Sequence, residues 1–89
     1  MAHNTAQHGA EQRILVPDDV AMLDLLGTGD SILQALEDGF TTVLVHVRGN
    51  VITVTGPPND VSLAATLVNE LIQLARAGTP LTPDLVRRS

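Results

Sequence analysis

Two short apolar segments, residues 41–48 (TTVLVHVR) and 51–55 (VITVT), constrain the fold of this chain more than any other feature. Both are rich in β-branched residues, which favour strands. They flank Gly49-Asn50, a pair typical of a two-residue hairpin loop. Because such a loop sets the register, Arg48 should pair with Val51. Each preceding residue of the first strand should then pair with the next residue of the second strand. The sequence therefore predicts an antiparallel hairpin with defined cross-strand partners.

The predicted register divides the hairpin into two faces of different chemistry, because side chains alternate along a strand and cross-strand partners share a face. One face is wholly apolar and should lie against the core. It consists of Val43, Val45, Val47, Ile52 and Val54. The opposite face mixes apolar, cationic and hydroxyl side chains, and consists of Leu44, His46, Arg48, Val51, Thr53 and Thr55.

A strand and a short helix are predicted near the N-terminus. Residues 12–16 form a short segment with β-branched side chains that is stopped by Pro17, which indicates a strand. Residues 19–26 show near-helical spacing of apolar side chains. Asp18 or Asp19 could cap that helix, and Gly27 would close it.

A second helix is predicted to begin directly after Gly27. Thr28 or Asp30 can accept a hydrogen bond from its first N–H groups, and Asp30 also suits the positive end of a helix. A left-handed Gly39 should end it, with Phe40 packing back on the last turn. Its inner face would be formed by Ile32, Leu33 and Leu36.

After the hairpin, Asn59 or Asp60 should cap a long helix that runs to about Ala77 and stops at Gly78 and Pro80. Its buried stripe is predicted to contain Val61, Ala64, Ala65, Val68, Leu71, Ile72 and Ala75.

The last segment predicts the start of one more helix, with Thr82 as cap and Pro83 at the first helical position. The complete order is β-α-turn-α-β-β-α. It defines an α+β fold with helices packed on one face of a three-stranded sheet.

Composition excludes several classes of function. The 89 residues contain no cysteine, which removes thiol catalysis and cysteine-based metal sites. Phe40 is the only aromatic residue, so the stacking platform of many single-strand binders is absent. The three histidines do not form a metal set, and we expect neither a metal ligand nor a catalytic residue in this chain.

The net charge of −5 disfavours general affinity for nucleic acids, which depends on cations that neutralise phosphates. The chain has no lysine, and neither lysine nor arginine occurs between Arg13 and Arg48. Six acids occupy that interval: Asp18, Asp19, Asp24, Asp30, Glu37 and Asp38. No apolar run approaches the ~20 residues of a membrane span and no signal segment is visible, so we expect a soluble cytoplasmic protein without membrane contact.

The turn of residues 27–30 supports two interpretations. As a phosphate clamp, it would offer the N–H groups that lack partners at a helix start. As a structural corner, it would only join two helices, and the carboxylate of Asp30 favours this interpretation because it repels a phosphate by ~1 kcal/mol or more near a surface. With the element order, the turn resembles that of the K-homology (KH) domain, whose GXXG loop clamps a nucleic-acid backbone. Gly27 matches the first glycine of that loop, and Asp30 replaces the fourth.

Three motifs in order resemble the N-terminal domain of PhoH-like proteins over residues 12–88. The first is the turn L-G-x-x-D-x-x-[LI], the second the hairpin H-x-R-G-N-x-I-x-[LIV]-x-G, and the third the segment G-x-x-L-[ST]. The matching residues are Leu26, Gly27, Asp30 and Leu33, then His46, Arg48, Gly49, Asn50, Ile52, Val54 and Gly56, then Gly78, Leu81 and Thr82.

The resemblance implies a KH-like accessory domain of a cytoplasmic P-loop ATPase linked to RNA metabolism and phosphate starvation. Residues 1–10 are small and polar, so we expect a disordered leader there. The resemblance implies a KH-like domain over 11–79 and a linker or helix over 80–89 that leads toward an ATPase domain. ATP and Mg²⁺ would belong to that domain, because this chain has no G-x-x-x-x-G-K-[ST] motif and no lysine. We therefore expect no enzymatic activity and no cofactor in this segment.

Three hypotheses for function remain from the sequence. The first is docking onto the ATPase domain and neighbouring subunits, with weak single-stranded RNA contact as a secondary role. The second is an RNA-binding module that acts through the turn of residues 27–30 by avidity in an oligomer. The third, a stand-alone small-molecule regulatory domain, lacks a convergent polar cluster. The residues predicted to contact nucleic acid are Gly27, Thr28, Gly29, Asp30, Ser31, His46 and Arg48.

Overall fold

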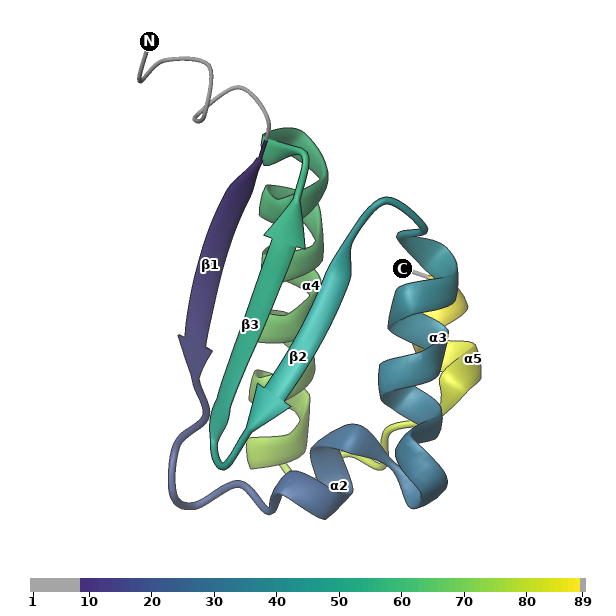
Figure 1. The fold of residues 1–89 in the computed structure, drawn as a ribbon. Coiled ribbons are helices and arrows are strands. Elements are labelled where there is room, and N and C mark those ends of the chain that lie inside the picture. The colour runs from purple at the N-terminus through teal and green to yellow at the C-terminus, as the bar shows by residue number, and fades with distance from the viewer. Residues whose placement is uncertain (1–8, 89) are drawn as a thin grey trace, which may run out of the picture.

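An antiparallel sheet with the strand order β1-β3-β2 organises the fold, which the computed structural model describes over residues 9–88 (Figure 1). The strands are β1 (Ala10–Leu15), β2 (Leu44–Arg48) and β3 (Val51–Gly56). The helices are α2 (Met22–Leu26), α3 (Ser31–Gly39), α4 (Pro58–Arg76) and α5 (Pro83–Arg88), with a 3₁₀ turn η1 (Thr28–Asp30) between α2 and α3. This arrangement confirms the predicted α+β class and the order β-α-α-β-β-α, to which α5 is added.

The hairpin of β2 and β3 has the predicted register. Arg48 pairs with Val51, His46 with Thr53 and Leu44 with Thr55, so the two residues of the loop set every later pair. Ile52 and Val54 of the predicted apolar face are buried, and Val45 and Val47 are half-buried. The alternation of apolar and polar side chains therefore identified the core face correctly.

The core lies between the sheet and the helices. β1 pairs with the other edge of β3, which places Ile14 opposite Ile52. Helix α4 lies across one face of β1 and β3, while α3 lies beside β2 and against α5 (Figure 1). The buried residues are Ile14, Val16, Val20, Leu25, Ile32, Ala35, Leu36, Val43, Ile52, Val54, Val61, Ala64, Ala65, Leu67, Val68, Leu71, Ile72 and Val86.

The end of α4 follows the predicted signals, whereas its start does not. Gly78 has a φ of 83°, and the N–H of Thr79 donates to the carbonyl of Leu74 at 2.9 Å, which is the bond pattern of a Schellman cap. At the start, neither Asn59 nor Asp60 caps the helix, because it begins at Pro58 without a side-chain cap. The carboxylate of Asp60 instead accepts a hydrogen bond from the hydroxyl of Thr42 at 2.5 Å.

Two other predicted helix boundaries are wrong. Helix α2 starts at Met22, and its N-cap Ala21 makes no side-chain bond. Asp19 is exposed and forms an ion pair with Arg76 of α4 at 3.2 Å, so a tertiary contact replaces the predicted cap. Gly39 lies within α3 without a positive φ, and the N–H of Phe40 ends the helix by donating to the carbonyl of Leu36 at 3.1 Å.

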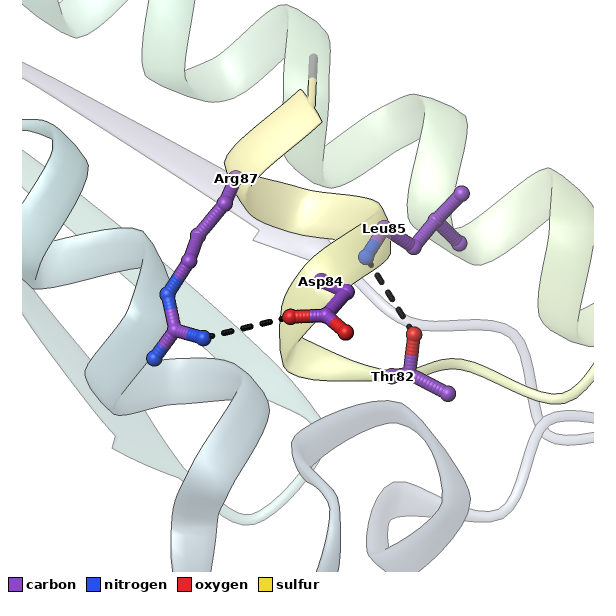
Figure 2. Close-up of polar contacts among 4 residues, drawn as sticks. All are labelled: Thr82, Asp84, Leu85 and Arg87. Carbon is purple, nitrogen blue, oxygen red and sulfur yellow. Dashed lines mark hydrogen bonds and ion pairs between the residues drawn. The ribbon is translucent and has the colours of Figure 1, made fainter.

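The last helix, α5, folds back onto the domain. The hydroxyl of Thr82 accepts a hydrogen bond from the N–H of Leu85 at 3.2 Å, which confirms the predicted cap, and Arg87 pairs with Asp84 at 3.4 Å (Figure 2). Val86 of α5 is buried and lines the same cavity as Leu67 of α4. Leu67 was not among the residues of α4 that were predicted to be buried. The sequence of that helix gives no indication that α5 lies near Leu67.

Two of the predicted segments, the leader and the C-terminal linker, contain residues that the structure describes. Strand β1 begins at Ala10, inside the predicted leader of residues 1–10, whose residues 1–8 lie outside the described range. The segment predicted as a linker or helix, residues 80–89, contains α5.

We expect Thr82→Ala to lower the free energy of unfolding by about 1 kcal/mol, the usual cost of losing an N-cap. The loss should appear in urea denaturation of the whole domain because Val86, four residues later, is part of the core. Thr79→Ala is the matched control, since the exposed Thr79 side chain accepts no such bond. Equal losses in both variants would contradict the capping role.

Candidate functional site

The glycine turn, defined as residues 27–30, has an unusual backbone. Gly27, Gly29 and Asp30 have φ angles of 81°, 62° and 59°, and only Asp30 among the described non-glycine residues has a positive φ. Gly27 ends α2 by donating its N–H to the carbonyl of Leu23 at 2.9 Å, as predicted. The N–H of Asp30 then donates to the carbonyl of Gly27 at 3.1 Å, which closes the turn.

Gly27 is required by packing as well as by conformation. A β-carbon at this position would lie 2.6 Å from Oγ of Ser31 and 2.8 Å from Cγ1 of the buried Ile32. At Gly29 a β-carbon would meet nothing within 4 Å. The first glycine therefore holds α2 and α3 in close approach, while the second supplies only a left-handed backbone.

Asp30 does not act as the predicted side-chain cap. It occupies the N-cap position of α3, but no side-chain cap hydrogen bond forms there. Its left-handed backbone differs from the extended conformation in which a cap side chain reaches the first N–H groups. The exposed carboxylate therefore adds negative charge at the turn without satisfying those N–H groups. The side chain of Thr28, the other predicted cap, lies outside the described part of the chain.

The surroundings of the glycine turn are acidic. An open cleft of roughly 490 Å³ lies between the turn and the segment that joins α4 to α5, and among the described residues that line it only Asp24 is charged. Arg76 of α4 pairs with Asp19 at 3.2 Å and does not line the cleft. A phosphate in the cleft would therefore meet no cation among the described residues that line it, which opposes the clamp interpretation.

His46 and Arg48 lie on the face of the sheet that α4 does not cover. Because β1 pairs with β3, three cross-strand rows form: Leu15–Val51–Arg48, Arg13–Thr53–His46 and Glu11–Thr55–Leu44. We call these nine residues the open sheet face. Leu15 and Leu44 are 69% and 72% exposed at opposite corners of it.

Sequence reasoning missed Arg13 and Leu15 as members of this surface. Their alternation with Ile14 and Val16 was a local signal that they share an outward face. Their position beside Thr53 and Val51 depends on β1 pairing with β3, which the strand itself does not encode.

The structure does not unite the predicted nucleic-acid residues into one site. Gly27, Gly29, Asp30 and Ser31 belong to the helical layer, and His46 and Arg48 to the opposite face of the sheet. Within residues 9–88 no hydrogen bond or ion pair joins the two groups. A ligand that contacts both groups would have to pass around β2.

Residues 9–88 hold neither a cluster of metal ligands nor a membrane-spanning helix. No three His, Asp or Glu side chains there gather closely enough to hold a metal ion. No helix of residues 9–88 combines the length and apolarity needed to cross a membrane.

Comparison with solved structures identifies the class of fold. Dim2p from Pyrococcus horikoshii OT3 matches 72% of this chain with a TM-score of 0.58 and 20% sequence identity, over 40% of that protein. The domain thus has a KH-like fold, in agreement with the interpretation of the glycine turn and the element order. No family model matches the chain.

Sequence comparison identifies the particular relatives. The PhoH-like protein of Mycobacterium tuberculosis (strain ATCC 25618 / H37Rv) is 46% identical over 74 residues, which are 83% of this chain and 20% of that protein. The PhoH-like protein of Mycobacterium leprae (strain TN) is 40% identical over 84 residues, which are 94% of this chain and 24% of that protein. The chain is homologous to a segment of these PhoH-like proteins, and it spans only about a fifth to a quarter of their length.

We expect Gly27→Ala to lower the free energy of unfolding by roughly 2–5 kcal/mol, since its backbone (φ 81°, ψ 166°) lies in a region essentially restricted to glycine and the new β-carbon would be overpacked. Gly29→Ala has a left-handed helical backbone (φ 62°, ψ 28°) with open space around it, and should cost about 1–2 kcal/mol. Chemical denaturation of both variants measures the difference. Similar losses would show that the close approach of α2 and α3 does not depend on Gly27.

Proposed function

We propose that this chain is a non-catalytic accessory domain of a PhoH-like protein, which docks through the open sheet face onto the larger part of that protein and onto neighbouring subunits. The proposal is supported by the share of the relatives that the chain spans, which leaves about three quarters or more of their length for other segments. The single observation that carries it is the exposure of Leu15 and Leu44 on that face.

The chemistry of the open sheet face suits a protein partner. Burial of an exposed leucine side chain contributes about 1.5–3 kcal/mol, so Leu44 can act as an apolar anchor. Arg13, His46 and Arg48 surround the two leucines, and Arg48 has no ion pair within residues 9–88. A complementary surface would be apolar with acidic groups at its rim.

Under this proposal the chemistry of ATP belongs to other residues. The family resemblance implies ATP and Mg²⁺ in the larger part of such a protein. This chain contributes no lysine for a phosphate-binding loop, so its role is to bind and orient. The KH-like fold then serves as a scaffold for contacts and holds no cofactor itself.

We expect Leu44→Ser to weaken docking about tenfold or more, because the apolar contribution is lost. The measurement is isothermal titration calorimetry against the Mycobacterium leprae PhoH-like protein produced without its matching segment. Leu63→Ser is the control, because Leu63 is 61% exposed on α4, away from the open sheet face. An absence of binding by the unaltered chain, or equal weakening by both variants, would overturn the proposal.

A second candidate function is single-stranded RNA binding through the glycine turn, multiplied by avidity in an oligomer. The start of α3, which lacks a side-chain cap, favours this candidate because its N–H groups suit an anion. The exposed carboxylate of Asp30 and the acidic cleft oppose it. We infer that any RNA contact by the single domain is weak and secondary to docking.

Chemical-shift titration with a short single-stranded RNA at low salt separates the two candidates. For the unaltered chain we expect no saturable shifts in residues 27–34 and 43–48. Asp30→Gly, which restores the second glycine of a GXXG loop, should show saturable shifts confined to residues 27–34. Asp38→Asn controls for the loss of one negative charge, since the exposed Asp38 lies near the other end of α3. Saturable shifts with the unaltered chain would favour the RNA-binding candidate.

A further inference from the structure

The outer edge of β1 offers hydrogen-bonding groups that the described fold does not use. β1 pairs with β3 on one side, and no strand within residues 9–88 pairs with its other side. The N–H of Val16 donates to the carbonyl of Asn50 at 2.8 Å, in step with the β1–β3 register. Because bonding direction alternates along a strand, Ala10, Gln12 and Ile14 face β3, and Glu11, Arg13 and Leu15 direct their backbone groups to the outer edge.

The side chains along this edge carry opposite charges around a neutral centre. Glu11 and Arg13 share the open sheet face, with Gln12 between them on the other face. They form an ion pair at 3.2 Å, but their side chains are 49% and 75% exposed. Such an exposed pair is weak, so either side chain can exchange its partner for one in another molecule.

Symmetry limits how two copies of β1 could pair in a closed dimer. A two-fold axis relates antiparallel strands only when it is perpendicular to the sheet, so one residue must lie opposite its own copy. Centring on Glu11 would oppose two carboxylates, and centring on Arg13 would oppose two guanidinium groups. Centring on Gln12 places Glu11 opposite Arg13 of the second copy on both sides of the axis.

We propose that β1 is a dimerisation edge, which pairs with β1 of a second copy about a two-fold axis at Gln12. The product is a continuous antiparallel sheet in which Glu11 and Arg13 exchange backbone hydrogen bonds and ion pairs with their counterparts. Charges on an edge strand usually oppose pairing with other chains. Here they oppose the registers centred on Glu11 and on Arg13, and they favour the register centred on Gln12, in which each acid lies opposite a base.

The rest of the fold is compatible with this pairing. Leu15 would lie opposite Gly9 of the second copy, which has no side chain to obstruct it. The β1 edge and α3 lie on opposite flanks of the domain, and α2 lies below the β2–β3 hairpin, so pairing at the β1 edge leaves the glycine turn of each copy accessible (Figure 1). The partner in this pairing is a second copy of the chain, so the proposal rests on the part of the proposed function that assigns contacts with neighbouring subunits.

A charge-reversal cycle tests the dimer by analytical ultracentrifugation of the full chain at low salt. Arg13→Glu and Glu11→Arg should each raise the dimer dissociation constant roughly tenfold or more, because symmetry doubles every like-charge contact. The double variant restores complementarity and should return the constant to near its original value. Arg88→Glu, the same charge change on exposed α5, should leave it unchanged. A chain that is monomeric at every accessible concentration, or a double variant as weak as the singles, would overturn the proposal.

Disulfide cross-linking tests the register, and the absence of native cysteine removes any background. Gln12→Cys would bring two thiols together in a pair that is not hydrogen-bonded, where the Cα atoms lie about 4.5 Å apart, within disulfide range. We expect this variant to cross-link at least about tenfold faster than Asn69→Cys, an exposed site on α4. Faster cross-linking by Arg13→Cys would contradict the register. These variants do not alter Leu44, so failure of the dimer is distinguishable from failure of docking.

Discussion

Packing of α4 against the inner face of the sheet is the contact on which the rest of this domain depends. Val54 of the central strand and Ala64 of α4 are both 0% exposed, and small residues in the stripe let helix and sheet approach closely. Because the other helices gather on the same side, the opposite face of the sheet stays uncovered. The open sheet face is a consequence of this one-sided packing, and the outer edge of β1 follows from the strand order β1-β3-β2.

Charge is distributed unevenly over this frame. Acids surround the glycine turn in the helical layer, whereas the open sheet face carries Arg13 and Arg48 with Glu11 as its one acid. The KH-like backbone of the turn is therefore kept in an electrostatic setting that repels phosphate. We interpret this separation as the reason why the sheet, and not the turn, is the better candidate for a binding surface.

Local signals predicted the elements whose determinants are close in sequence. The register of the hairpin followed from Gly49-Asn50, and the start of α5 from Thr82-Pro83. Prediction failed where a distant partner competed for a side chain. Asp19 pairs with Arg76 and Asp60 accepts from Thr42, so neither forms the cap that local rules expect. Asp30 failed for a different reason, because its left-handed backbone is incompatible with side-chain capping.

By itself the sequence determined the strand pairing of β2 with β3, the composition of the core face and the likeness to PhoH-like proteins, because each depends on periodicity and spacing within short segments. Only the tertiary structure decided that β1 adds Arg13 and Leu15 to the open sheet face, that Leu67 lines a cavity with Val86 of α5, and that the predicted nucleic-acid residues lie on separate surfaces. These facts depend on which distant segments pack against each other, and local sequence patterns do not predict such contacts.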